Sequence, residues 1–433
     1  MPKRTAEPTG ETQDNQTKSP VIYEADQHTI KKSDIDEDAR KVVYRLQRAG
    51  FKAYIVGGGV RDILLGKQPK DFDISTDATP RQIKALFRNC RIIGRRFKLA
   101  HVFYAHGKIL EVSTFRDTAD IPEPSESETT TQAPMVTNDN IYGTEETDAL
   151  RRDLTINGLF LDVSTMQIID YVNGMIDLQQ GTIRIIGDPD LRFREDPVRM
   201  LRAVRHSARN GFHIESGCWS SILKNAELIS QCSQVRVFDE LRKDVSSGCF
   251  LTILSLLGET GLLEYILPEL LENNGRLLSA ESDCSVCLEK IDDLVSEGRE
   301  MSATTVFAIL AMFMAGDSIW LRDLAESIPN APDLGERLGA CFTRLTVPRK
   351  ERERIQLLLT MWGRLRDTAP KALKAGAYKR SALLPDLVSL VEITQFSRED
   401  AQRLNLLNEI LHGEAGHHPH PEHPQKPAHL RHR

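Results

Sequence analysis

An acidic pair on a short strand is the feature that most constrains how this chain can fold. In the stretch PKDFDIST (69–76), Asp71 and Asp73 alternate with Phe72 and Ile74. Successive side chains of a strand point to opposite faces, so both carboxylates leave one face and the apolar residues leave the other. Two like charges held side by side repel each other, and folds rarely accept such a pair without a use for it.

A glycine-rich turn precedes the acidic pair. FKAYIV (51–56) is predicted to be a strand, and VGGGVRD (56–62) is predicted to turn from it into a helix. Glycines let backbone N–H groups approach an anion closely, and Arg61 adds a cation that suits phosphate. A phosphate-binding turn beside paired carboxylates is the arrangement that two-metal phosphoryl transfer requires. The alternative is a solvent-facing acidic pair on an edge strand.

Glu111 is the predicted third acid of this site. It lies in ILEVSTFR (109–116), where Ser113 shares its face and Leu110 and Val112 take the opposite one. Bound metal ions would screen the repulsion among three carboxylates, which explains why the clustered charge is tolerated. The sequence therefore predicts a site for two Mg²⁺ ions, and carboxylates alone leave Mn²⁺ open as an alternative.

The order of predicted elements indicates an α+β fold. Strand and helix signals alternate to residue 186, and helix signals dominate from Asp196 to residue 411. This order predicts a head with a mixed sheet, followed by an all-α neck, body and tail. The predicted boundaries are a disordered tail at 1–32, the head at 33–186 with a mobile insertion at 117–149, the neck at 187–260, the body at 261–411 and a disordered His/Pro-rich tail at 412–433.

Composition narrows the class of protein. The longest apolar run, TTVFAILAMFMAG (304–316), is shorter than the roughly 18 residues of a membrane span and is predicted to be a buried helix. The N-terminus has no apolar signal segment, and seven scattered cysteines favour a reducing compartment. Cys284 and Cys287 are predicted to be helix-face thiols rather than zinc ligands. These features predict a cytoplasmic protein without a membrane partner.

A helix rich in arginine is predicted at REDPVRMLRAVR (194–205). Asp196 and Pro197 suit the N-cap and first position of a helix. Apolar side chains give the helix one buried side, and its arginines recur every three residues as a cationic stripe: Arg199, Arg202 and Arg205. The alternative is a surface helix held by ion pairs.

Four motifs in a fixed order carry a resemblance to a known family. VGGGVRD with PKDFDIST, EVSTFR, RRDLTIN (151–157) and REDPVRMLRAVR resemble the nucleotidyltransferases of the bacterial poly(A) polymerase and CCA-adding tRNA enzyme family. The resemblance covers roughly residues 33–248 by motif and implies a palm-like nucleotidyltransferase head.

The resemblance also implies roles for individual residues. It implies that the catalytic residues are Asp71, Asp73, Glu111 and Asp153, of which Asp71, Asp73 and Glu111 bind the metal ions. In the family, the RRD motif contacts the nucleotide: its Asp meets the ribose 2′-hydroxyl and an Arg meets the phosphates. The Asp and the first Arg of the arginine-rich helix motif face the Watson–Crick edge of the incoming base. The implied nucleotide-binding residues are Gly57, Gly58, Arg61, Arg151, Arg152, Asp153, Asn157, Asp196, Arg199, Arg202 and Arg205.

The segment IIGRRFKLAHV (92–102) favours one activity of the family. It resembles the corresponding segment of bacterial poly(A) polymerases, and LTVPRKERERIQLLLTMWGRL (345–365) resembles their RNA-gripping part. The resemblance implies template-independent transfer of AMP from ATP to RNA 3′ ends, which promotes mRNA turnover. RNA held by backbone charge and stacking tolerates a changing sequence. The predicted RNA-binding residues are Arg95, Arg96, Lys98, Arg349 and Lys350.

Two other functions remain as alternatives. One is a CCA-adding tRNA nucleotidyltransferase, which shares the four motifs. The other is a non-catalytic RNA-binding protein, against which the intact acidic residues argue. The predicted partners are ATP and the 3′ ends of mRNA and small RNAs, with RNA-degradation machinery as a further partner, and the predicted state is a monomer.

Overall fold

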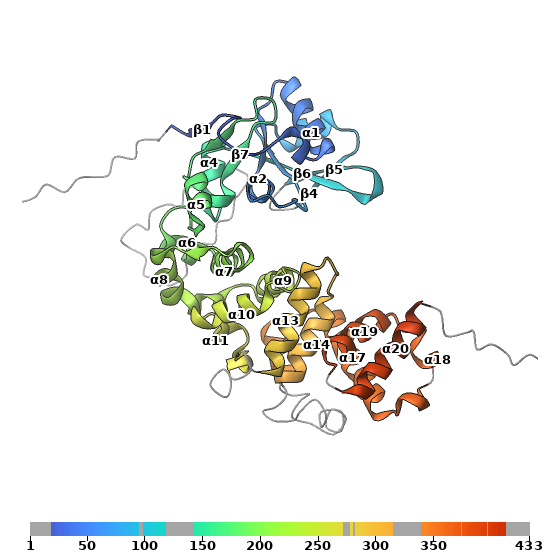
Figure 1. The fold of residues 1–433 in the computed structure, drawn as a ribbon. Helices are drawn as coiled ribbons and strands as arrows, with labels where there is room; N and C mark the ends of the chain where they lie inside the picture. Colours follow the sequence, from blue (N-terminus) through green and yellow to red (C-terminus); the bar gives the residue numbers. More distant parts are fainter. Residues whose placement is uncertain are drawn as a thin grey trace, which may run out of the picture. The chain divides into compact units, whose positions relative to one another are not determined.

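The computed structural model describes residues 19–94, 98–117, 142–271, 278–279, 282–314, 339–373, 375–395 and 397–412. The chain divides into two compact units, one of Met1–Arg199 with Asn210–Ile222 and one of Met200–Arg209 with Leu223–Arg433. In Figure 1 the strands belong to the blue-to-green part of the chain, and the yellow-to-red part is helical. This architecture confirms the predicted α+β class.

The first unit is built on an eight-stranded mixed sheet with the order β1-β8-β7-β2-β3-β6-β5-β4. All neighbouring strands run antiparallel except β3 and β6, which are parallel. The strands are β1 (Val21–Tyr23), β2 (Ala53–Val56), β3 (Asp73–Thr76), β4 (Cys90–Ile93), β5 (Leu99–Phe103), β6 (Ile109–Thr114), β7 (Leu159–Leu161) and β8 (Ile168–Asp170). A separate pair, β9 (Thr182–Ile183) and β10 (His213–Ile214), is parallel.

Two helices pack on one face of the sheet. Helix α1 (Glu37–Arg48) starts where the Asp36 side chain accepts a hydrogen bond from the Ala39 N–H, and α3 (Pro80–Leu86) starts at a Thr79 cap. Their apolar sides share one core with the strand residues that point toward them. That core includes Val42, Leu46, Ile74, Ile83, Ala100, Val102, Leu110 and Val112.

Every second side chain of β5 and β6 points away from this core. The side chains that point into the core are buried, and those between them are half-buried on β5 and exposed or half-buried on β6. The side chains on this open face are Leu99, His101, Phe103, Ile109, Glu111 and Ser113. The period of two that the sequence predicts for 109–114 is thereby confirmed.

The remaining elements of the first unit are mostly short. They are η1 (Lys32–Asp34), α2 (Gly58–Leu64), η2 (Ala105–Gly107), α4 (Glu145–Leu150), η3 (Thr155–Asn157), α5 (Gly174–Gln180), α6 (Pro189–Glu195) and α8 (Ser216–Asn225). The chain passes between the units within α7 (Val198–Asn210) and again after Ile222 in α8, whereas the sequence placed the end of the head at residue 186. Helix α6 belongs to the first unit, where Arg192 donates to the carbonyls of Arg151 and Arg152.

The second unit is helical throughout its described residues. Helix α14 is buried almost along its whole length, as predicted for that segment, and Cys284 and Cys287 are buried on α13. No helix among the described residues is long and apolar enough to cross a membrane. The elements are η4 (Ala226–Gln231), α9 (Gln234–Val245), α10 (Phe250–Glu259), α11 (Leu263–Ile266), η5 (Pro268–Leu271), α13 (Asp283–Ser296), α14 (Ala303–Met314), α17 (Arg349–Asp367), η7 (Pro370–Ala372), α18 (Ala375–Tyr378), α19 (Leu384–Ile393) and α20 (Arg398–His412).

The predicted N-terminal tail at 1–32 is too long. Residues 1–18 lie outside the described residues, but β1 pairs with β8 so that Val21 lies opposite Asp170. Ile30 is buried in the head core. A three-residue strand is too short to recognise by its own pattern, because its hydrogen bonds come from a strand far along the chain.

The predicted mobile insertion at 117–149 is also partly wrong. Residues 118–141 lie outside the described residues, and the segment after them is structured. Tyr142 forms a β-bridge with Arg116, and Thr144 caps α4. Asp148 and Ala149 of this helix are buried, and Ala149 packs in an apolar cluster with Tyr54 and Phe160.

Candidate active site

Three acids of the predicted set are neighbours around β3 and β6. Asp73 is the first residue of β3, Asp71 precedes the strand, and the parallel strand β6 carries Glu111. Desolvation raises the pKa of Asp73 most, and the carboxylates of Glu111 and Asp71 raise it further, whereas Arg152 lowers it. Negative charge therefore accumulates at Asp73 and is only partly compensated.

The carboxylates of Asp71, Asp73 and Glu111 are suitable ligands for a divalent cation. Carboxylate oxygens are the ligands that Mg²⁺ and Ca²⁺ prefer, and a bound cation would offset the mutual repulsion. Among the described residues, however, no three acidic, histidine or cysteine side chains are arranged as a ready ligand set. The Glu111 carboxylate instead lies 3.4 Å from the His101 ring nitrogen on β5. Asp71, Asp73 and Glu111 are the residues that would hold the ion.

The glycine turn lies directly beside the acidic pair. Val56 at the end of β2 is paired with Asp73, so the chain turns at Gly57 next to the carboxylates. Gly57 has φ +71°, which is strained for any residue with a Cβ, and a Cβ there would lie 3.0 Å from the Arg152 guanidinium. The turn therefore requires glycine both for its backbone and for the approach of Arg152.

Arg61 does not occupy the place that the sequence suggests. It is 3% exposed, and its guanidinium donates to Asp62 at 2.7 and 2.9 Å and to the Asn157 side-chain oxygen at 2.5 Å. The predicted phosphate-binding cation is thus buried and hydrogen-bonded within the protein. Its contacts tie helix α2 to the segment around Asn157 and so fix the glycine turn.

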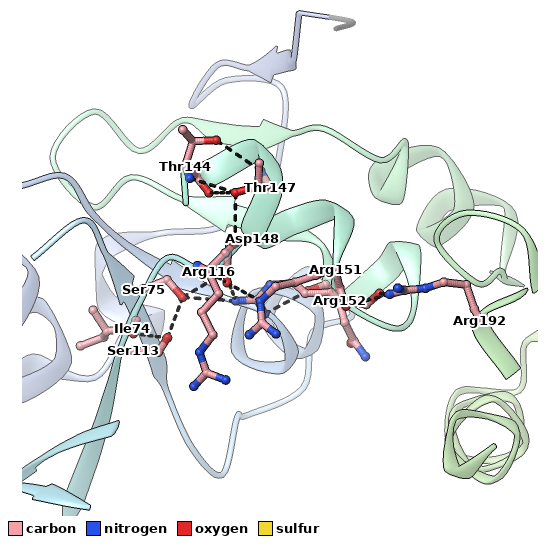
Figure 2. A network of polar contacts seen from close by, with 11 residues as sticks. Ile74, Ser75, Ser113, Arg116, Thr144, Thr147, Asp148, Arg151, Arg152 and Arg192 are labelled. Carbon is pink, nitrogen blue, oxygen red and sulfur yellow. Dashed lines mark hydrogen bonds and ion pairs between the residues drawn. The ribbon is translucent and has the colours of Figure 1, made fainter. Parts of the chain in front are cut away.

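Two arginines converge on one buried acid beside the turn (Figure 2). Asp148 accepts hydrogen bonds from Arg151 and from Arg152, both at 3.0 Å, and Arg152 also donates to Ser75 at 3.2 Å. Burial opposes the ionisation of Asp148, but the charges of Arg152 and Arg151 outweigh it, and the pKa of Asp148 is lowered. The ring of Phe160 lies under the Arg152 guanidinium, with 5.3 Å between them.

Asp148 falls within the segment predicted to be a mobile insertion, and its contact with the two arginines is not among the predicted site residues. Its signal was its position three and four residues before the two arginines, the spacing at which helical side chains meet. Arg192 was missed as well: it donates to the carbonyl oxygens of Arg151 and Arg152, both at 2.8 Å. No local pattern indicates that contact, because the partners are 40 and 41 residues apart.

Asp153 and Asn157 are brought together by the turn that carries them. The Asn157 side-chain amide donates to Asp153 at 3.3 Å, and the Leu154 N–H donates to the same carboxylate oxygen at 2.8 Å. Asn157 thus links Asp153 to Arg61. Farther along, Arg199 donates to Glu195 at 2.8 Å and to the Arg192 carbonyl at 2.9 Å.

Asp196 and Arg199 lie where α6 gives way to α7. Asp196 ends α6, and its carbonyl accepts from the Arg199 N–H at 3.0 Å, so the predicted helix start near Asp196 is confirmed. The rest of the arginine stripe belongs to the second unit, where Arg202 is half-buried.

Arg205 is buried and is bound inside the second unit. Its guanidinium makes ion pairs with Glu240 and Asp244 on α9. Burial opposes the ionisation of Glu240, but the charge of Arg205 and a hydrogen bond from Lys243 outweigh it, and the pKa of Glu240 is lowered. Arg205, which was predicted to bind nucleotide, is thus already paired with acids of its own unit. Its charge is neutralised by acids 35 and 39 residues away.

The predicted RNA-binding residues are dispersed over the chain. Arg95 and Arg96 lie outside the described residues, and Lys98 is exposed just before β5. Arg349 and Lys350 are exposed at the start of α17, where Arg349 pairs with Glu353 at 2.7 Å.

Comparison with known proteins agrees with the class that this fold and site define, the nucleotidyltransferases. Residues 53–184 match the family model described as "Poly A polymerase head domain". Residues 211–273 match the model described as "Probable RNA and SrmB- binding site of polymerase A". The chain belongs to the nucleotidyltransferase family that contains the bacterial poly(A) polymerases and the CCA-adding enzymes.

Both branches of this family are represented among the similar proteins. Poly(A) polymerase I of Salmonella typhimurium is 45% identical over 301 residues, which are 68% of this chain and 63% of that protein. The CCA-adding enzyme of Geobacillus thermodenitrificans is 35% identical over 236 residues, 54% of this chain and 55% of that protein. The chain thus spans less than two thirds of the length of these relatives.

A solved structure supports the fold over most of the chain. The CCA-adding enzyme of Bacillus stearothermophilus, solved in complex with CTP, superposes with a TM-score of 0.64 at 24% identity. The likeness covers 87% of this chain and 82% of that chain. At this identity the likeness concerns the fold.

Proposed function

We propose that this chain is a polynucleotide adenylyltransferase that adds AMP from ATP to RNA 3′ ends without a template. The observation that carries the proposal is the group formed by Asp71, Asp73 and Glu111 beside the glycine turn at Gly57. The higher identity to Poly(A) polymerase I than to a CCA-adding enzyme supports AMP as the transferred group.

The acids supply the reacting end of the proposed site. Mg²⁺ or Mn²⁺ held there would lower the pKa of the RNA 3′-hydroxyl and offset charge on the phosphates of ATP. The 3′-hydroxyl gives its proton to solvent, and its oxygen forms a bond to the α-phosphorus of ATP. The bond from the α-phosphorus to the oxygen that bridges to the β-phosphorus breaks, and pyrophosphate leaves with that electron pair. Asp71, Asp73 and Glu111 keep the surroundings of the hydroxyl negative, which favours binding of the cations.

The arginines beside the turn supply the phosphate-binding end. Asp148 and Ser75 fix the Arg152 guanidinium next to Gly57, and this preorganised cation would meet the triphosphate. Asp153, held by Asn157, is the proposed contact for the ribose hydroxyls. Arg61 acts through Asn157 and the turn, as a positioning residue.

Substitution of Asp73 by alanine tests the catalytic proposal. Asp73→Ala should abolish AMP incorporation into an RNA primer while RNA binding remains nearly intact, because the acid acts on the reacting atoms and not on the RNA backbone. Primer extension and fluorescence anisotropy with the same labelled RNA measure both properties. Undiminished incorporation by this variant would remove the proposed site.

Arg199 and Asp196 are the proposed contacts for the base edge. Arg199 is held by Glu195 and the Arg192 carbonyl, so its position is fixed before nucleotide binds. Arg199→Ala should relax the choice among the four nucleoside triphosphates more than it weakens RNA binding. Arg194→Ala, which removes an exposed arginine of α6, is the matched control. An unchanged nucleotide preference would refute the role of Arg199.

A CCA-adding activity is the second candidate, favoured by the 35% identity to the Geobacillus enzyme. The proposed partners are ATP and the 3′ ends of mRNA and small RNAs, and the family model matched by residues 211–273 supports RNA as a partner. A cytoplasmic monomer that cooperates with RNA-degradation machinery is our proposal for its setting. Light scattering and co-purification from a cell extract would test it.

A further inference from the structure

A row of polar side chains crosses the open face of the sheet from the acids to the sheet edge. Arg91 on β4 pairs with His101 on β5, and His101 pairs with Glu111 on β6. Because Ile74 pairs with Val112, the next residue back on each parallel strand brings Asp73 beside Glu111. The row therefore runs Asp73, Glu111, His101, Arg91, with positive charge at the end far from the acids.

A second row beside it is aromatic and apolar. Phe103 pairs with Ile109, which is 43% exposed although it is a large aliphatic residue. The Arg91 guanidinium lies over the Phe103 ring at 5.6 Å from its centroid, and the His101 ring is 6.4 Å from the Phe103 ring. Three planar side chains thus gather on one face of the sheet, with His101 and Phe103 on the strand next to Glu111 and Arg91 one strand farther away.

The geometry of phosphoryl transfer indicates on which side of the acids ATP and the RNA acceptor bind. The glycine turn lies at the end of β2, on the Asp73 side that faces away from β6. In phosphoryl transfer the attacking and leaving oxygens lie roughly in line on opposite sides of the phosphorus. If the pyrophosphate leaves toward the β2 turn, the RNA 3′-hydroxyl must arrive from the opposite side, across β6 and β5.

We propose that Arg91, His101 and Phe103 form a stacking surface for the last bases of the single-stranded RNA acceptor. The inference rests on the proposed function, because it uses the direction of adenylyl transfer. Bases stack on aromatic rings and guanidinium planes without regard to sequence, and a growing tail requires such tolerance. The Arg91 charge favours an anionic strand at a place that otherwise adjoins an acidic group.

Variants of Arg91 and Phe103 test the surface, since neither touches the acids. Stacking contributes about 1–3 kcal/mol per base, which corresponds to roughly 5- to 150-fold in binding. Arg91→Ala and Phe103→Leu should therefore raise the KM for an oligo(A) acceptor at least about fivefold and change the KM for ATP less than about twofold. Arg91→Lys keeps the charge but not the plane and should recover only part of the loss.

The control removes an equivalent charge from the other side of the sheet. Arg81 is exposed on α3, which packs on the covered face, and Arg81→Ala should leave the KM for the acceptor unchanged. Circular dichroism and thermal unfolding establish that each variant is folded. If Phe103→Leu proves unstable, Arg91→Ala and Arg91→Lys still test whether this surface binds the acceptor. An acceptor KM for Arg91→Ala equal to that of the wild type overturns the surface.

An acceptor without its terminal bases separates stacking from charge. The modified acceptor is oligo(A) in which the two nucleotides just before the 3′-terminal one lack their bases. Compared with intact oligo(A), it should have a higher KM with the wild type. With Phe103→Leu the increase should be much smaller, because the stacking contact is already lost. Equal effects on both proteins contradict stacking. Failure of the proposed function gives a different result, namely no AMP incorporation by the wild type into any acceptor.

Discussion

Asp73 and Asp148 are two carboxylates of the same head domain that share Arg152 as a neighbour, and their pKa values move in opposite directions. Two arginines surround Asp148 and lower its pKa despite burial. Desolvation and two acidic neighbours raise the pKa of Asp73, and Arg152 compensates only in part. Asp148 is a completed structural contact, whereas Asp73 stands in a group of negative charge that the protein compensates only in part.

The comparison contrasts a structural charge cluster with the cluster proposed to be catalytic. A structural cluster pairs each charge within the protein, and removal of one member leaves the others exposed to a desolvation cost. A catalytic cluster keeps charges of one sign together, at a cost in stability that the rest of the fold offsets. The predictions below test this distinction, beginning with the largest expected effect.

Arg205 provides the strongest case of a completed cluster. Arg205→Ala leaves the buried Asp244 carboxylate without an ion-pair partner among the described residues and leaves Glu240 with only the exposed Lys243, and the free energy of unfolding should fall by about 3–5 kcal/mol. Urea unfolding measures the change. A triple variant with apolar side chains of similar volume at all three positions should lose much less. A loss below about 1 kcal/mol in Arg205→Ala would contradict the structural role.

Asp148→Asn should destabilise the head by about 2 kcal/mol, because hydrogen bonds to charged groups contribute roughly that much. The cost is below that of Arg205 because Arg151 and Arg152 are partly exposed and can be hydrated. The same change should raise the KM for ATP by freeing Arg152. Glu37→Gln, which breaks the exposed pair with Lys41, is the control and should cost less than about 1 kcal/mol. An unchanged KM for ATP would disconnect Arg152 from nucleotide binding.

The pH dependence of stability should separate Asp73 from Asp148. A lowered pKa in the folded state adds stability above the unfolded value of about 3.9, and that stability is lost as the pH falls through the folded pKa. A raised pKa has the opposite sign, so the cost of Asp73 is present at high pH and disappears on acidification.

Asp73→Asn should therefore be slightly more stable than the wild type at about pH 7 in buffer with a chelator, and the difference should vanish below about pH 4. For Asp148→Asn, the deficit against the wild type should shrink over the same acidification. Thermal unfolding across the pH range measures both curves. Two curves with the same slope would refute the distinction between the clusters.

The smallest effect is expected at the exposed end of α17. Arg349→Gln breaks only a surface pair with Glu353 and should change the free energy of unfolding by less than about 0.5 kcal/mol. If Arg349 contacts an RNA phosphate, its removal should lower the salt slope of RNA binding by about one. A salt slope equal to that of the wild type would remove Arg349 from the RNA-binding set.

Features with a short-range pattern were predictable from the sequence, and those that depend on distant partners were not. The alternation around Glu111 and the glycine turn before Asp73 follow from local spacing. Arg61 and Arg205 were interpreted as ligand-facing because their buried partners are 96 and 35 residues away. The role of Asp148 was not predicted, because the short capped helix that carries it directly follows a polar stretch and was included in the predicted mobile insertion.

The measurement that tests the central claim most directly is the product ladder of a one-nucleotide extension assay. The wild-type protein is supplied with Mg²⁺ and a labelled acceptor, either a single-stranded RNA or a tRNA that lacks its terminal CCA. Each acceptor is tested with each nucleoside triphosphate alone and with CTP and ATP together. The account predicts long ladders with ATP alone on the single-stranded RNA. Addition of two C residues and one A, confined to the tRNA, would contradict it.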